Sequence, residues 1–111
     1  MKPIIRYEKD VAWNKEGPFP AKILLSKLDA SVASVKVGTL EKGRKIEPHM
    51  HADCDQLEYY IEGKALMFIE GLGEREIGKD VFTYIPKGVK HGVLNVDESL
   101  VILTVFVPPL F

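Results

Sequence analysis

Residues 43–63 read GRKIEPHMHADCDQLEYYIEG and hold two of the three histidines in the 111-residue chain. His49 and His51 are separated by one residue, so on an extended strand both imidazole rings point to the same face. Pro48, directly before them, is poorly tolerated inside a helix. The segment therefore predicts an extended piece of chain that presents two imidazoles side by side.

The third histidine, His91, lies in a second short segment, PKGVKHGVLN at residues 86–95. It follows the turn signal Pro86-Lys87-Gly88 and begins a predicted strand. A single histidine is usually a surface or core residue, but here all three histidines of the chain lie on predicted extended segments that could bring them to one site. Two histidines from one strand and one from a distant strand can supply three nitrogen ligands to one divalent metal ion. We predict such a site.

Short extended segments, punctuated by glycine, proline and acidic residues, make up most of the chain. Val35 and Val37 alternate with polar neighbours, which is the period of a half-buried strand. No segment shows a sustained helical pattern. The predicted strands are 21–28, 32–40, 45–51, 57–61, 65–69, 81–85, 92–96 and 100–107. This spacing favours an all-β sandwich, jelly roll or barrel, formed as one domain by residues 1–111.

The composition excludes several classes of protein. A hydrophobic content of 46% with 28% charged residues is typical of a globular chain. With a net charge of -1, the chain has no excess of positive charge with which to bind nucleic acid or an anionic membrane. Cys54 is the only cysteine, so no disulfide forms within the chain. The N-terminus has no apolar stretch of the signal-peptide type. We expect a cytoplasmic protein without nucleic-acid or membrane partners.

Two spacings resemble the paired sequence motifs of the cupin superfamily. The first motif, within residues 43–63, is carried by Gly43, His49, His51, Gln56 and Gly63; the second, within residues 80–95, is carried by Pro86, Gly88, His91 and Asn95. The resemblance implies a double-stranded β-helix, or jelly-roll, barrel that is commonly dimeric. It also implies a metal ion inside the wider end of the barrel.

The sequence departs from the cupin pattern at two positions. The family's usual metal-binding glutamate falls on Gln56, and the usual glycine that opens the second motif falls on Asp80. With three imidazoles and one amide as ligands, the metal would keep its full +2 charge. It would then attract an anionic substrate and polarise a carbonyl or hydroxyl group more strongly. Alternatively, Gln56 is a polar residue that does not bind the metal.

The neutral ligand set favours Lewis-acid chemistry over redox turnover, since no negative ligand stabilises a higher oxidation state. Some cupins with glutamine at this position are similar to this chain, notably sugar-acid isomerases that open unsaturated uronates. Certain polyketide cyclases also place glutamine near the metal. The identity of the ion stays open among zinc, manganese, iron, nickel and copper.

Strand alternation predicts two further residues inside the barrel. If Gln56 points inward, Glu58 and Tyr60 do so as well. Glu58 is then a candidate general base. It could instead bind the metal while Gln56 turns aside, or pair with an interior lysine or arginine. Tyr60 could donate a hydrogen bond to a substrate oxygen, although a core tyrosine is the more common case.

The remaining candidates have structural interpretations. Alternation places Val93 and Asn95 inward with His91, and we expect Asn95 to support a turn. Asp53 and Asp55 flank Cys54 and should raise its pKa, which argues against a reactive thiol. Three more residues are expected to pack in the core: Met50, Met67 and Trp13.

The predicted function is that of a metal-dependent enzyme acting on a small oxygenated anion, a sugar acid or keto acid. In this isomerase or lyase chemistry the ion stabilises an enediolate while Glu58 or a water molecule moves the proton. The alternatives are a metal-dependent dioxygenase and a non-catalytic module that binds a small ligand or a metal. Residues 100–107 are apolar on both faces except for Thr104, which predicts a homodimer unless the N-terminal segment covers the outer face.

Overall fold

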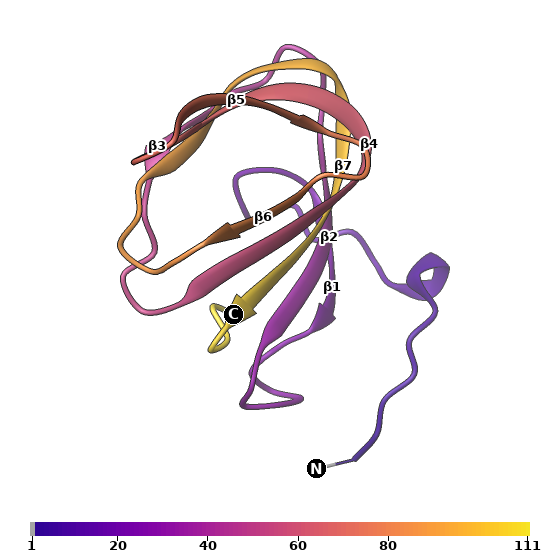
Figure 1. Ribbon diagram of the computed structural model, residues 1–111. Helices are drawn as coiled ribbons and strands as arrows, with labels where there is room; N and C mark the ends of the chain where they lie inside the picture. The colour runs from indigo at the N-terminus through magenta and orange to yellow at the C-terminus, as the bar shows by residue number, and fades with distance from the viewer. Residues whose placement is uncertain (1) are drawn as a thin grey trace.

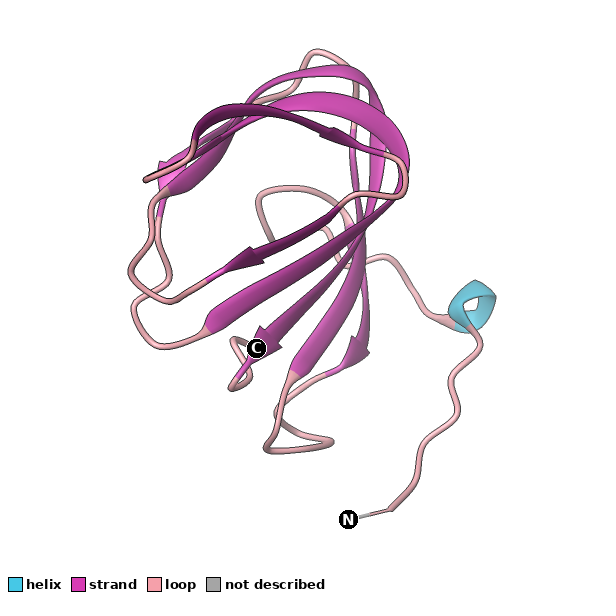
Figure 2. Ribbon diagram, in the orientation of Figure 1, coloured by secondary structure: helices cyan, strands magenta, loops and turns pink. Residues whose placement is uncertain are grey.

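The chain folds into two facing β-sheets that share two long strands (Figures 1 and 2). The computed structural model describes residues 2–111. The strands are β1 (Ala21–Leu25), β2 (Ser34–Leu40), β3 (Ile46–His49), β4 (Asp55–Ile69), β5 (Gly73–Gly78), β6 (Phe82–Ile85) and β7 (His91–Val107). A 3-10 turn, η1 (Glu8–Asp10), lies in the N-terminal segment outside the sheets. The expected all-β fold is confirmed.

The pairing of the strands explains how two sheets arise from seven strands. One sheet has the order β1-β2-β7-β4-β6 and uses the second half of β7 with the first half of β4. The other has the order β3-β7-β4-β5 and uses the opposite halves of the same two strands. All pairs are antiparallel. The sheets therefore enclose one interior, with β4 and β7 passing from one sheet to the other.

Both shared strands are longer than predicted, because they bend where the sequence suggested turns. The register between β4 and β7 shifts around Glu62, next to Gly63, which has a φ of +97°. A Cβ atom on Gly63 would collide with the backbone carbonyl of Ser99 in β7. Glycine therefore allows β4 and β7 to bend together without losing their pairing.

Among the other strands, β1, β2, β3 and β6 are each shorter than predicted, and β5 is additional. β1 ends at Leu25, where Ser26 and Asp29 form a turn closed by a hydrogen bond from the Ser26 N–H to Asp29 Oδ2. β5 was not predicted. It reads GEREIG and contains only one apolar side chain, Ile77, which is buried. Charged residues are common on edge strands such as this one, where they discourage further pairing.

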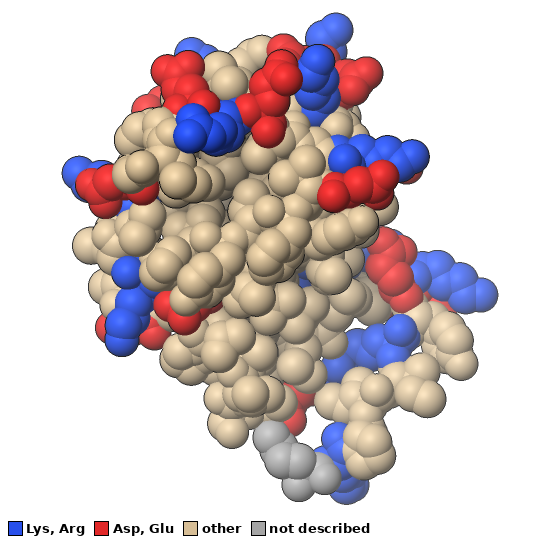
Figure 3. All heavy atoms as spheres, viewed as in Figure 1, with Lys and Arg blue, Asp and Glu red and all other residues tan. Residues whose placement is uncertain are grey.

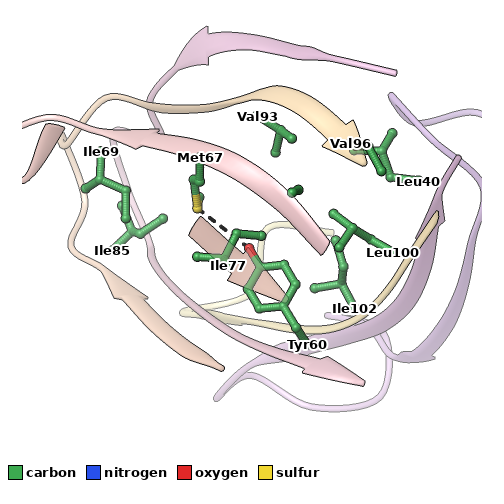
Figure 4. Close-up of a cluster of buried hydrophobic side chains, with 11 residues drawn as sticks. Leu40, Tyr60, Met67, Ile69, Ile77, Ile85, Val93, Val96, Leu100 and Ile102 are labelled. Atoms are coloured by element: carbon green, nitrogen blue, oxygen red, sulfur yellow. Dashed lines mark hydrogen bonds between the residues drawn. The ribbon is translucent and has the colours of Figure 1, made fainter. Parts of the chain in front are cut away.

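The interior has an apolar part and a hollow part. Figure 4 shows the apolar part, in which Tyr60 points toward Met67 and its hydroxyl lies 3.7 Å from the Met67 sulfur. The cluster consists of Leu40, Tyr60, Ala65, Met67, Ile69, Ile77, Ile85, Val93, Val96, Leu100 and Ile102. Beside it lies a cavity of about 130 Å³, which all three histidines line. Four residues belong to both parts: Tyr60, Met67, Val93 and Ile102.

Candidate metal centre

The three histidines meet on one wall of the cavity. His49 ends β3 and is the register partner of His91, which begins β7. β3 ends two residues before the predicted end of this strand, so His51 lies beyond it. The His51 carbonyl accepts a hydrogen bond from the Gly88 N–H at 2.8 Å. The ring centroids are 4.4–5.5 Å apart. The predicted convergence of the three rings is therefore confirmed.

Backbone carbonyls fix the orientation of two of these rings. His49 Nδ1 lies 2.8 Å from the Glu47 carbonyl, and His91 Nδ1 lies 3.0 Å from the Val89 carbonyl. A carbonyl oxygen only accepts hydrogen bonds, so Nδ1 carries the proton in both rings. The lone pair of each ring is then on Nε2, the usual arrangement of a metal-binding histidine.

The donor set fits a divalent metal ion. One nitrogen of each histidine lies within 4.8 Å of the others, close enough to share an ion. His91 Nε2 is buried and lacks a hydrogen-bond partner among the described residues. Such an atom normally costs free energy, which a bound cation would recover. Burial also lowers the pKa of His91 to about 4, so the ring stays neutral and able to bind a cation at physiological pH.

Gln56, Glu58 and Tyr60 point inward, as strand alternation predicted. Their side chains line the cavity and are 6%, 7% and 1% exposed, whereas Tyr59 between them is 42% exposed. Burial lowers the pKa of His51, and the neighbouring Gln56 side chain opposes part of this fall. That Gln56, or alternatively Glu58, is a fourth metal ligand stays a prediction.

The Glu58 carboxyl group is held by two hydroxyls. Tyr60 Oη donates to Glu58 Oε1 at 2.9 Å, and Thr83 Oγ1 donates to the same oxygen at 3.3 Å. Burial raises the pKa of Glu58, and these two hydrogen bonds oppose that rise. Burial also raises the pKa of Tyr60, so its hydroxyl stays protonated and remains a donor to Glu58. The role predicted for Tyr60 as a hydrogen-bond donor to substrate stays a prediction.

Several other sequence predictions are corrected or refined. Asn95 does not point inward with Val93: the register with β4 shifts at this point, and the exposed Asn95 donates instead to Asp97 Oδ1 at 2.7 Å. Met50 and Trp13 do not pack in the core, because they are 49% and 46% exposed. Met67 is buried, as expected.

The predicted rise in the pKa of the Cys54 thiol is confirmed. Its side chain is 3% exposed, and burial raises the pKa of the thiol, with further contributions from Asp53 and Asp55. Burial is the larger cause, which the sequence prediction did not include. A buried, protonated thiol is a poor nucleophile, so Cys54 is not a candidate catalytic residue.

Three polar residues of the site were not identified from the sequence: Lys36 and Thr104, which line the cavity, and Thr83, which donates a hydrogen bond to Glu58. Lys36 sits in a strand with an ordinary alternating pattern, and Thr83 in a short strand of mixed composition, so neither stands out. Thr104 did carry a signal, because it is the only polar residue of the apolar run 100–107. Its inward direction becomes clear only from the pairing of β7 with β4, where Thr104 lies opposite Glu58.

Comparison with known proteins agrees with this geometry. The family model described as "Cupin domain" matches residues 36–106, which include all three histidines. Two curated relatives, both uncharacterised, come from Aquifex aeolicus (33% identical over 61 residues, 55% of this chain) and Streptomyces coelicolor (29% over 76 residues, 68% of this chain). The match spans 50% of the Aquifex protein and 70% of the Streptomyces protein.

Solved structures share the fold at low sequence identity. KdgF from Halomonas sp. has a TM-score of 0.80 at 19% identity, with 92% of each chain covered. Ectoine synthase from P. lautus has a TM-score of 0.86 at 17% identity, covering 97% of this chain and 80% of its own. A predicted oxalate decarboxylase from Thermotoga maritima has a TM-score of 0.81 at 16% identity, covering 95% and 99%. The expected jelly-roll barrel is confirmed.

Proposed function

Because this chain belongs to the cupin family, we propose that it is a metal-dependent enzyme that moves a proton on a small oxygenated anion, such as a sugar acid or keto acid. The observation that carries the proposal is a buried carboxyl group, Glu58, fixed by two hydroxyls in the cavity that the three histidines line. The names of two structural neighbours, a synthase and a predicted decarboxylase, support an enzymatic use of this fold.

The chemistry divides between the ion and Glu58. His49, His51 and His91 would hold the ion, and when bound it supplies Lewis acidity that polarises a substrate carbonyl or hydroxyl. Glu58 then takes a proton from the carbon next to the polarised group and returns it to a neighbouring atom. Both hydroxyls donate to Oε1, so neither occupies Oε2, which we assign as the oxygen that carries the moving proton.

Tyr60 and Thr83 act as positioning residues in this scheme. They prevent rotation of the Glu58 carboxyl group and offset part of the cost of burying its negative charge. The apolar part of the cavity, which includes Val93, Ile102 and Phe106, excludes water from the reacting atoms. The lone thiol of Cys54 suits a reducing compartment, so the cytoplasm is the expected location.

A deuterium-exchange experiment tests the role of Glu58. Protein purified without added metal is first analysed for bound elements. Exchange of carbon-bound protons is then followed by NMR in D₂O for a panel of keto acids and uronic acids. For a substrate that exchanges, Glu58→Gln should slow exchange at least about 100-fold, the usual contribution of a general base, while metal content is unchanged.

The control variant is Glu62→Gln, which removes an exposed carboxylate from the same strand and should leave exchange unaffected. Loss of the metal from Glu58→Gln would show that Glu58 is a ligand, which contradicts its role as base. Exchange at the wild-type rate in Glu58→Gln would also overturn the proposal. Substrate-dependent oxygen uptake would favour the dioxygenase alternative, and ligand binding without any conversion would favour a binding module.

A further inference from the structure

A row of polar side chains crosses the inner face of the larger sheet. The strand registers place Lys36 of β2 opposite Thr104 of β7, Thr104 opposite Glu58 of β4, and Glu58 opposite Thr83 of β6. Directly opposed side chains on one face of a sheet lie about 4.5–5.5 Å apart at their Cβ atoms. The first three residues of the row, Lys36, Thr104 and Glu58, line the cavity with the histidines.

Lys36 brings a positive charge into this cavity, where it is attracted to Glu58 without forming an ion pair with it. Its Nζ lies 4.7 Å from the centroid of the Phe19 ring, 5.9 Å from that of Phe106 and 6.0 Å from that of Phe111. Aromatic faces attract a cation, but they supply no hydrogen-bond acceptor comparable to a carboxylate. Among residues 2–111, none of the ion pairs within 4.0 Å includes Lys36.

Glu58 does not satisfy the Lys36 ammonium group, although it is the nearest candidate in the row. The hydrogen bonds of Glu58 Oε1 come from Tyr60 and Thr83 instead. The pairing of Glu58 with an interior lysine, one of the alternatives open from the sequence, is therefore not formed within ion-pair distance. The half-buried Lys36 ammonium group therefore has no carboxylate at ion-pair distance among the described residues, and an anion that enters the cavity would supply one.

Thr104, opposite Lys36, provides a buried polar group without a partner among residues 2–111. Its side chain is 2% exposed, and its Oγ1 is buried without a hydrogen-bond partner in the described part of the chain. An unpaired buried hydroxyl costs about 1–3 kcal/mol. A valine of nearly the same shape would avoid this cost. The free-energy cost of the unpaired hydroxyl disappears only when Thr104 Oγ1 forms a hydrogen bond with a group that occupies the cavity.

We infer that Lys36 and Thr104 form a subsite for the carboxylate of a short organic acid, with Lys36 Nζ supplying the charge and Thr104 Oγ1 a hydrogen bond. This inference rests on the proposed function, and it specifies the orientation of the substrate. The carboxylate lies at the β2–β7 wall, and the oxygen that the ion polarises lies toward His49, His51 and His91. The cavity of about 130 Å³ is close in size to one that holds benzene, which sets the size of the part of the acid that enters it.

Binding measurements test the subsite without requiring turnover. Wild-type protein as purified is titrated by calorimetry with acetate, glycolate, pyruvate and malonate, and with the neutral amide of each. Wild type should prefer at least one acid over its amide by about tenfold or more. Lys36→Met should reduce that preference several-fold, because the charged hydrogen bond is lost, while the attraction to the bound ion remains. Lys36→Arg should retain part of it.

Lys22→Met is the matched control. Lys22, like Lys36, lies over an aromatic ring, with its Nζ 5.0 Å from the centroid of Trp13, but it donates hydrogen bonds to Glu8 on the outside of β1. This variant should keep the wild-type preference for acids. An equal preference in Lys36→Met and wild type, or no preference for any acid in wild type, would overturn the inference. Inorganic sulfate that competes as well as the acids would also overturn it, since the site would then bind any anion.

Thr104→Val gives an independent result that a purely structural role would not produce. Without ligand, the variant should unfold at a higher temperature than wild type, because an unpaired buried hydroxyl is removed. Its affinity for the preferred acid should nevertheless fall several-fold. A lower melting temperature or an unchanged affinity would remove Thr104 from the subsite. Acid binding that depends on Lys36 and Thr104, without any proton exchange, would support the subsite while contradicting the proposed enzyme.

Discussion

Among residues 2–111, Asp80 is the only residue other than glycine with a positive φ, at +69°. The backbone there adopts the left-handed conformation that glycine accommodates without strain, and this is the position where the cupin pattern usually has glycine. Asp80 Oδ1 accepts a hydrogen bond from the Tyr59 hydroxyl at 3.2 Å. The carboxylate therefore stabilises a backbone conformation that its own Cβ disfavours.

Two substitutions at position 80 separate these effects. Asp80→Gly and Asp80→Ala both lose the hydrogen bond from Tyr59, but only alanine keeps the Cβ. We predict that Asp80→Gly is more stable than Asp80→Ala by about 1 kcal/mol, measured by urea unfolding. Equal stabilities would mean that the local backbone relaxes and that φ at position 80 carries no strain.

At the scale of single residues, the sequence predicted those parts of the site that depend on local spacing. His49, His51 and Gln56 lie within eight residues of one another, and alternation along one strand was enough to orient Glu58. Lys36 could not be identified in this way, because its neighbours in the cavity, Thr104 and Phe19, come from other parts of the chain. Residues of that kind are recognised only when the strand registers are known.

At the scale of strands, the metal centre depends on the close contact of β3 with β7. A Cβ atom on Gly92 would lie 2.6 Å from the Ile46 carbonyl oxygen and 2.9 Å from the Pro48 nitrogen, both in the backbone of β3. Contacts this short cannot be relieved by turning a side chain. A larger residue at position 92 must push β3, and with it His49, away from His91.

Gly92→Ala should therefore weaken metal binding more than its small change in volume suggests. We predict at least a tenfold loss of metal affinity, the effect expected when the support of a ligand is displaced, together with about 1–3 kcal/mol of lost stability. Affinity is measured by competition with a chelator. Gly17→Ala is the control, since the nearest contact of its new Cβ would be an ordinary 3.8 Å. Wild-type affinity in Gly92→Ala would contradict the prediction.

The limits of strand prediction have physical causes that differ between elements. β4 and β7 were each predicted as two strands, because Gly63 and the pair Asp97-Glu98 are turn signals in isolation, yet here they mark bends inside paired strands. The register shift near Asn95 reversed the expected direction of that side chain for the same reason. Bends of this kind depend on the partner strand, which local sequence does not describe.

At the scale of the whole molecule, the outer surface retains a broad apolar area. Four side chains on β4 and β6 are 41–56% exposed: Tyr59, Ile61, Phe82 and Tyr84. In the view of Figure 3, charged side chains gather toward the edges and leave the region over β4 and β6 mostly uncharged. The N-terminal segment reaches the outer face at Lys22 of β1, through Glu8 and Trp13, while the area on β4 and β6 stays exposed.

None of the helices in residues 2–111 has the length and apolarity to span a bilayer.

We propose that a second copy of this chain covers the apolar area on β4 and β6. Light scattering after gel filtration should then give a mass of about twice the 12.5 kDa of one chain. Phe82→Glu should shift the protein toward the monomer, because it places a charge in the apolar contact. Leu28→Glu changes a leucine that is 93% exposed in a loop and should leave the mass unchanged. A monomer at all concentrations would contradict this proposal.

The double use of β7 also sets the order in which the protein can be assembled. Its pairing partners are β2, β3 and β4, so each of them has an open edge until β7 arrives. Ile69 and His91 pair across 22 residues, whereas Asp55 and Val107 pair across 52. Contacts between such distant residues form slowly. During synthesis, the unpaired strand edges of β2, β3 and β4 therefore stay exposed to aggregation until β7 is complete at residue 107.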